Sequence, residues 1–279
     1  MLLLQYVFKS CLSYTVHASL SVDVGAGRLL PVSIKICLVQ RKAVYYDERY
    51  GASSFLDDRV YKERPKDYEV LDYFSISKWL DEAGRGDLLV FAQDVVPYTA
   101  YEITPFSQDS KLLRFLQRGG TVVWIGDVPF FYRLHCYERE MRDRLNETKE
   151  ALKRSVAFTP MPNFYLHKFG PYERGDKVCA LDIIGGFYAD LEVEWMGLDY
   201  KHLGFYKLNE VCYLGSKTNV RPTLLGGLLG YEDAFSVRPT KYTTRIYPLT
   251  MTTLEGVCRG RYAGSWIAEV GGGAFVRLY

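Results

Sequence analysis

The sequence contains no pair of cysteines at C-x-x-C spacing and no cluster of cysteine and histidine at zinc-ligand spacing. A structural zinc site is therefore not expected. The six cysteines lie far apart, at positions Cys11, Cys37, Cys136, Cys179, Cys212 and Cys258. In a chain long enough to build its own core, this spacing favours mostly buried free thiols in a reducing compartment, with one or two disulfides as the alternative.

An excess of charge of either sign is also missing. The formal net charge is +2, so the chain lacks the basic surplus of a dedicated nucleic-acid-binding protein.

Long apolar runs are absent as well. The apolar opening, Met1 to Phe8, is too short to span a bilayer, and Lys9 interrupts a signal-peptide core. We expect no membrane segment and a cytoplasmic location, with export as the minor alternative because Val16-His17-Ala18 resembles a cleavage site.

The chain has instead an ample supply of apolar residues. Its 279 residues are 48% hydrophobic, which is enough for one large α/β domain or for a domain with an appendage. Tyrosine is abundant, at 23 residues. Tyrosine side chains serve both core packing and the recognition of flat or hydroxylated ligands, and packing is the more common use.

Polar and apolar residues alternate strictly over residues 15–24 and again over residues 30–38. Each segment is typical of a half-buried strand, and Gly25-Ala26-Gly27 supplies the turn between them. Residues 1–41 are therefore predicted to form a β-hairpin appendage, and residues 42–279 the α/β domain.

The α/β domain is predicted from strands that alternate with helices. Predicted strands cover residues 42–46, 69–73, 87–92, 121–125, 178–184 and 211–214. One predicted helix begins after Ser75, which is taken as its N-cap. A second covers residues 111–117 and ends at Gly119-Gly120. The tail turns at Gly271-Gly272-Gly273 and closes as a second hairpin. This alternation predicts a doubly wound, mostly parallel sheet with antiparallel hairpins at both termini.

Charge pattern and Gly/Pro content predict the structure of two further segments, residues 134–154 and 220–240. Opposite charges at helical spacing, such as Glu138 with Arg142, predict a solvated helix over residues 134–154. Gly and Pro are frequent over residues 220–240, where Val-Arg-Pro-Thr occurs twice, and this composition predicts a loop region.

Three of the predicted strands end in an acid: Asp47, Asp94 and Asp127. The carboxyl ends of parallel strands share one edge of a sheet, so these carboxylates are expected to line one crevice. There they can bind a hard cation, accept hydrogen bonds from sugar hydroxyls, or act as acid and base. Alternatively, each Asp caps only the turn that follows its strand.

The layout resembles the class I glutamine-amidotransferase-like superfamily, in particular its ThuA-like and glycosidase-associated members. The resemblance rests on the segments 87–92, 113–126 and 265–276. It implies a flavodoxin-like or amidotransferase-like sheet. Amidotransferases place a nucleophilic Cys at the elbow after the strand that corresponds to Val122–Ile125. Here that elbow reads Gly126-Asp127-Val128-Pro129 and has no Cys.

The missing nucleophile predicts a member of the superfamily without amidotransferase activity. Cys136, the nearest thiol, lies well beyond the turn, so we expect it to alkylate as an ordinary thiol; its pairing with His135 or His167 as a nucleophile is the minor alternative. The sequence identifies no catalytic residue and no cofactor.

Three functions stay open. The first is binding of a small polar molecule, a carbohydrate or nucleotide, at the sheet edge. Its candidate ligand-binding residues are Asp47, Asp94, Gly126, Asp127, Tyr46 and Phe130, with Tyr45, Trp124, Phe131 and Tyr132 as further nearby aromatics. The second is a structural or assembly subunit that forms an oligomer through its terminal hairpins. The third is a metal-assisted hydrolase that holds Mg²⁺ or Mn²⁺ on the three acids.

Overall fold

A computed structural model describes residues 19–23, 29–33, 41–47, 59–93, 95–100, 110–126, 129, 132–138, 172–174, 177–183, 218–236, 239–244, 246–255 and 259–279. The elements within these residues, in chain order, are β1 (Ser19–Asp23), β2 (Leu29–Ser33), β3 (Lys42–Tyr45), α3 (Arg59–Lys62), β4 (Glu69–Leu71), α4 (Ser75–Glu82), β5 (Leu88–Phe91), β6 (Val95–Pro97), the 3₁₀ helix η1 (Tyr98–Ala100), α5 (Lys111–Gln117), β7 (Thr121–Ile125), β8 (Tyr132–Glu138), β9 (Tyr172–Arg174), β10 (Lys177–Ile183), β11 (Thr218–Pro222), α9 (Leu224–Leu228), β12 (Ala234–Ser236), β13 (Thr240–Lys241), β14 (Ile246–Pro248), β15 (Thr250–Leu254), β16 (Gly260–Ala263), β17 (Trp266–Val270) and β18 (Gly273–Leu278).

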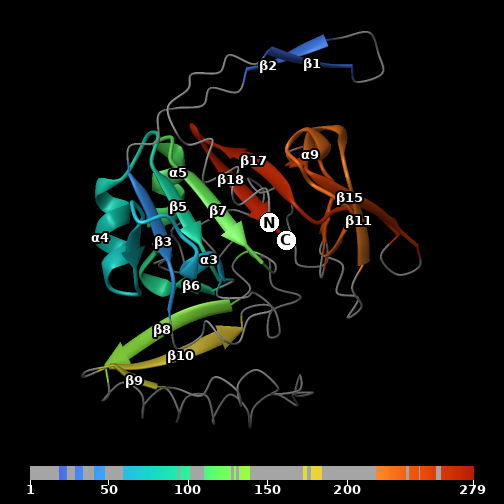
Figure 1. Cartoon of the computed structure of the whole chain (residues 1–279). Coiled ribbons are helices and arrows are strands. Elements are labelled where there is room, and N and C mark those ends of the chain that lie inside the picture. The colour runs from blue at the N-terminus through green and yellow to red at the C-terminus, as the bar shows by residue number, and fades with distance from the viewer. Residues whose placement is uncertain are drawn as a thin grey trace.

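A seven-stranded sheet is the centre of the fold, with the order β14-β17-β18-β7-β5-β3-β4 (Figure 1). The strands β18, β7, β5, β3 and β4 run parallel, and β17 and β14 extend the sheet in antiparallel fashion. The predicted α/β class with a mostly parallel sheet is thus confirmed. The predicted closing hairpin is confirmed too, since β17 and β18 pair from Trp266↔Arg277 to Val270↔Gly273.

Helices cover both faces of this sheet. On one face, α4 and α5 bury Trp79, Leu80 and Phe115 in a core shared with the sheet residues Tyr45 and Trp124. On the other face, a second core contains residues of β3, β5 and β7, and Tyr61 of α3 and Leu225 of α9 pack against it. All four residues of β5 are buried, because a parallel strand between two helical layers has no solvated face.

Side chains accept hydrogen bonds from backbone nitrogens at the start of both principal helices, but only α5 has a side-chain N-cap. Ser110 accepts a hydrogen bond from the backbone nitrogen of Leu113 at the start of α5. For α4 the sequence predicts Ser75 as the N-cap, and this is wrong. Ser75 is the first helical residue, and the carboxylate of Asp72 accepts hydrogen bonds from the backbone nitrogens of Phe74 (3.1 Å) and Ser75 (2.9 Å). A carboxylate at this position satisfies donors that the helix cannot pair internally.

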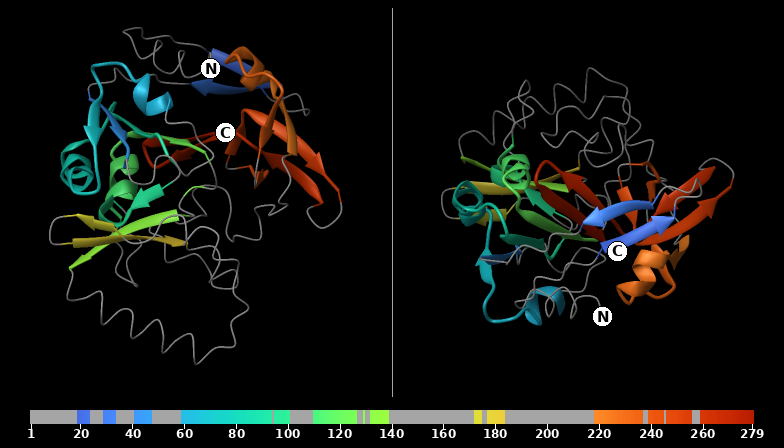
Figure 2. Two further views of the ribbon diagram at one scale, coloured as in Figure 1. Left: turned by 60° about the horizontal axis from the view of Figure 1, so that its bottom comes forward. Right: turned by 90° about the horizontal axis from the view of Figure 1, so that it is seen from above.

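Three smaller sheets surround the centre within the described residues. β1 and β2 form the predicted antiparallel hairpin, with Ser19 opposite Ser33. A four-stranded sheet has the order β6-β8-β10-β9, and a five-stranded antiparallel sheet has the order β12-β11-β15-β16-β13. The five-stranded sheet lies beside the β17–β18 end of the central sheet in all views (Figures 1 and 2).

Two segment predictions are corrected by these sheets. The helix predicted from residue 134 is wrong where the structure describes it, because Tyr132–Glu138 form β8, which pairs with β10. The loop predicted for residues 220–240 is also wrong: it contains the end of β11, the short helix α9, β12 and the first residue of β13. The strand predicted for residues 211–214 lies outside the described residues.

The expectation of free thiols is wrong for two of the six cysteines. Cys136 and Cys179 form a disulfide, at opposite positions of β8 and β10. The other four cysteines lie outside the described residues. None of the helices that the structure describes is long and apolar enough to cross a membrane.

Candidate functional site

The carboxyl edge of the parallel strands contains a change of chain direction. Counted along the chain, the five parallel strands lie in the order 2-1-3-4-5, because β4 lies on one side of β3, and β5, β7 and β18 follow on the other. In open α/β sheets, ligands bind beyond the carboxyl ends of the strands where the winding direction changes. In this chain that point is the junction of β3 and β5.

Hydrogen bonds fix the main chain at this junction. The backbone nitrogen of Tyr46 donates to the carbonyl oxygen of Leu71 at 3.1 Å, and that of Ala92 donates to Tyr45 at 3.2 Å. Asp47 and Gln93 are the next residues after these contacts. Tyr45 pairs with Phe91, so the same register continued by two residues brings Asp47 level with Gln93.

Gln93 is the unusual residue of the edge. Its side chain is buried, with 1% exposure, and neither its amide nitrogen nor its amide oxygen has a hydrogen-bond partner within the described part of the chain. A buried amide without partners costs about 1–3 kcal/mol of stability. Gln93 was not among the residues predicted from the sequence, although it is a polar side chain directly after the apolar run Leu88–Ala92.

Two of the predicted site residues, Tyr46 and Gly126, are held in place by contacts within the protein. Tyr46 is 9% exposed, and its ring stacks on Tyr61 of α3 at a centroid distance of 4.0 Å. Gly126 has a positive φ of 119°, a conformation that glycine adopts without strain. Its nitrogen donates to Leu278 at 2.8 Å, and its oxygen accepts from Nε of Arg277 at 3.3 Å. Both residues therefore anchor the edge.

The predicted acids are only partly described. Asp47 follows β3 and is buried, with 4% exposure. Asp94, Asp127 and Phe130 lie outside the described residues. The strands β3, β5 and β7 are parallel neighbours, so their carboxyl ends do share an edge.

Among the nearby aromatics, Tyr45 and Trp124 are fully buried core residues. No group of three metal-ligating side chains occurs within the part that the structure describes.

Arg277 of β18 is a second residue that sequence reasoning missed. Its side chain is fully buried, and Nη1 donates to Oγ1 of Thr240 at 3.1 Å. The guanidinium also lies 5.5 Å from the ring centroid of Tyr279. The signal was an arginine within the apolar run Phe275–Leu278. Arg277 connects the carboxyl edge of the central sheet to β13 of the five-stranded sheet.

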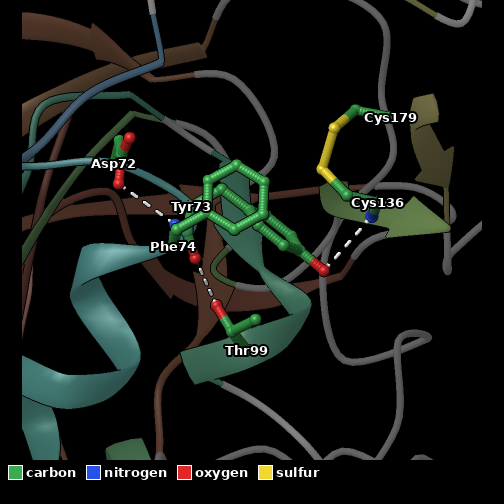
Figure 3. Close-up of a disulfide and its surroundings, with 6 residues drawn as sticks. All are labelled: Asp72, Tyr73, Phe74, Thr99, Cys136 and Cys179. Carbon is green, nitrogen blue, oxygen red and sulfur yellow. Dashed lines mark hydrogen bonds between the residues drawn. A yellow bond between two sulfur atoms is a disulfide. The ribbon is translucent and has the colours of Figure 1, made fainter. Parts of the chain in front are cut away.

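Two further groups of residues lie near the β4 and β18 ends of this edge. At the β4 end, the hydroxyl of Thr99 donates to the carbonyl oxygen of Tyr73 (2.7 Å), and the phenol oxygen of Tyr73 accepts from the backbone nitrogen of Cys136 (3.1 Å; Figure 3). At the β18 end, burial raises the pKa of the Tyr231 phenol, an effect that the Ser265 side chain partly offsets. Tyr231 therefore stays protonated and neutral.

One comparison with known proteins covers residues of this edge. Residues 40–160 match the model of the MJECL34 family, a segment that contains Asp47, Gln93 and Gly126. The chain is also similar to the uncharacterized protein MJECL34 of Methanocaldococcus jannaschii, at 39% identity over 95 residues. This alignment covers 31% of the chain and 32% of the relative, so the chain matches about a third of that protein's length. No solved structure matches the chain.

Proposed function

We propose that the chain binds a small polar molecule, a carbohydrate or a nucleotide, at the junction of β3 and β5, with Gln93 as the central hydrogen-bonding residue. The observation that carries this proposal is the buried amide of Gln93, whose donor and acceptor are both without partners in the described residues. A ligand that offers both an acceptor and a donor removes the cost of burying that amide. Sugar hydroxyls and base edges have this property.

The arrangement of the strands supports this location. The order 2-1-3-4-5 and the helices on both faces fit a doubly wound sheet of the flavodoxin-like type, and in such sheets the junction is the usual ligand crevice. Asp47, next to Gln93 in the continued register, supplies a carboxylate that accepts hydrogen bonds from ligand hydroxyls.

In this proposal the protein is a member of the amidotransferase-like superfamily that does not catalyse acyl transfer. Two features support the loss of that chemistry: the elbow after β7 has no Cys, and Cys136 lies in a disulfide on β8. A thiol in a disulfide supplies no thiolate nucleophile.

A thermal-shift screen of sugars and nucleotides tests the proposal. We expect at least one ligand to raise the Tm of the wild type, and Gln93→Met and Asp127→Ala to abolish that shift. Without ligand, the Gln93→Met variant is expected to be at least as stable as the wild type. Methionine has nearly the size of glutamine, and the substitution removes a buried amide that lacks hydrogen-bond partners. The matched control is Gln117→Met, the same change at an exposed position of α5. A ligand shift that survives in Gln93→Met would refute the proposal.

An assembly function is the second candidate. Both edge strands of the central sheet carry large exposed apolar side chains, Val70 on β4 (40% exposed) and Tyr247 on β14 (44%). Exposed sheet edges pair readily with other chains. Light scattering at high concentration decides this point: a strictly monomeric species argues against assembly of identical chains.

A further inference from the structure

The five-stranded sheet carries a cavity of about 450 Å³ that is widely open to solvent. Its lining residues come from three neighbouring strands, β11, β15 and β16: Asn219, Arg221, Met251, Thr252, Thr253 and Arg261. The cavity lies outside the segment that matches the MJECL34 family, so nothing in that comparison accounts for it.

Strand register places the two arginines on one face. Arg221 lies opposite Met251, and Thr253 lies opposite Arg261. Because side chains alternate between faces along a strand, all four of these residues share a face, with Asn219 two positions from Arg221. The opposite face holds Val220 and Tyr262, which are buried. The spacing of strands and residues puts the Cα atoms of the two arginines about 12 Å apart.

Neither of the two arginines forms an ion pair with a carboxylate within the part of the chain that the structure describes. The guanidinium of Arg261 lies 5.0 Å from the ring centroid of Tyr242, and its Nη2 atom donates to Sδ of Met251 at 3.6 Å. The aromatic ring and the thioether orient the planar guanidinium without supplying a counter-charge.

We propose that this cavity binds the phosphate group of a small molecule. Its polar lining offers hydrogen-bond donors from the two guanidiniums, the Asn219 amide and the residues Thr252 and Thr253, and among the described residues it includes no carboxylate. Guanidiniums bind phosphate oxygens in bidentate geometry, and a phosphate monoester carries close to two negative charges at neutral pH. The arginines flank β15 from either side, so both long side chains reach one group bound above that strand. Met251 supplies an apolar surface for the rest of the ligand.

Calorimetry of the full-length chain with pyrophosphate tests the site. We expect saturable one-to-one binding that weakens at least about tenfold in Arg221→Gln and in Arg261→Gln, the loss of one charge-assisted pair. Arg261→Lys keeps the charge but loses the bidentate fork, so it is expected to bind between wild type and Arg261→Gln. Both arginines are exposed, and circular dichroism is expected to show that the variants fold.

The matched control is Lys241→Gln. Lys241 is exposed on the same sheet, but it lies opposite Tyr262 and therefore on the other face. Its replacement is expected to leave pyrophosphate binding unchanged. Equal losses in all three glutamine variants would mean non-specific charge attraction and would overturn the site. No binding at 10 mM pyrophosphate, or tighter binding of a single-stranded oligonucleotide through the same arginines, would overturn the assignment to a small phosphorylated molecule.

Discussion

The Nη1 atom of Arg277 donates to Oγ1 of Thr240 across the boundary between the central sheet and the five-stranded sheet. The same hydroxyl oxygen also accepts a hydrogen bond from Nε1 of Trp266 at 3.1 Å. All three side chains are fully buried. A single hydroxyl oxygen thus satisfies two buried donors.

Thr240→Val is therefore expected to lower the free energy of unfolding by about 1–3 kcal/mol, because it leaves two buried donors without this acceptor at nearly constant volume. Urea unfolding measures the effect. The control is Thr253→Val on the exposed part of β15, for which we expect a change within about 0.5 kcal/mol. Equal effects of the two variants would contradict a structural role for the Thr240 hydroxyl.

The two adjacent glycines of α9 are expected to respond in opposite ways to alanine. A Cβ atom at Gly226 would lie 1.8 Å from the carbonyl oxygen of Leu249, whereas one at Gly227 meets no atom within 4 Å. Gly226→Ala should therefore displace α9 and lower stability by at least about 1 kcal/mol. Gly227→Ala should raise it by about 0.5–1 kcal/mol through helix propensity. Thermal unfolding of the two variants compares them directly, and a stabilising Gly226→Ala would contradict the packing of α9 on Leu249.

The disulfide between Cys136 and Cys179 closes a loop with a sequence separation of 43. Its removal in the double variant Cys136→Ala/Cys179→Ala is expected to lower stability by about 2–4 kcal/mol. In the native protein, iodoacetamide should label neither cysteine until a reductant is added, which replaces the sequence-based expectation of an ordinary Cys136 thiol. Mass spectrometry with and without reductant reads the labelling. Labelling of Cys136 in unreduced protein would show that the bond is absent in solution.

The ion pair between Lys42 and Asp67 predicts a small dependence of stability on pH. Nζ of Lys42 donates to the carboxylate at 2.8 Å, and this hydrogen bond holds the pKa of Asp67 below its ordinary value. A lowered folded-state pKa adds stability above the ordinary value, and this contribution is lost as the pH falls below about 4. Asp67 is 58% exposed, so Lys42→Met should cost less than about 1 kcal/mol at neutral pH.

An NMR titration of the Asp67 carboxyl group measures this effect. The pKa should rise toward its ordinary value in Lys42→Met. The stability difference between this variant and the wild type should vanish in acid. If the pKa of Asp67 is unchanged by the substitution, the pair does not exist in solution.

Most strands of the central sheet could be predicted because each of these is marked within its own segment by an apolar run and a neighbouring turn. The strand β7 follows the Gly119-Gly120 turn as an apolar run, and burial on both faces leaves that pattern in the sequence. By contrast, β8 begins a segment whose many charged residues suggested a helix, and it is a strand because it pairs with β10 on one side and with β6 on the other. Tertiary pairing of this kind overrides local propensity and cannot be read from one segment.

In the candidate site, too, some residues could be identified from a local sequence pattern, whereas others required knowledge of how the strands pair. Asp47 was predictable because an acid after an apolar strand is a local pattern. Gln93 needed the register of β3 and β5, and Arg277 needed the knowledge that β18 lies beside β7 rather than at an edge. The cavity around Arg221 and Arg261 depends on three strands together. The segment that contains Arg221 is rich in Gly and Pro, and it gave only a loop prediction.

The position of β18 also has a consequence for how the protein is made. β3, β4, β5 and β7 are synthesised in close succession and can pair as soon as they leave the ribosome, whereas β18 closes its pairing with β7 across a long span of chain. During that delay the Thr121–Ile125 strand is an unpaired, apolar sheet edge, the kind of surface on which nascent chains aggregate. Synthesis in the cell is therefore expected to pass through a stage at which a chaperone that covers extended apolar segments raises the yield of native protein.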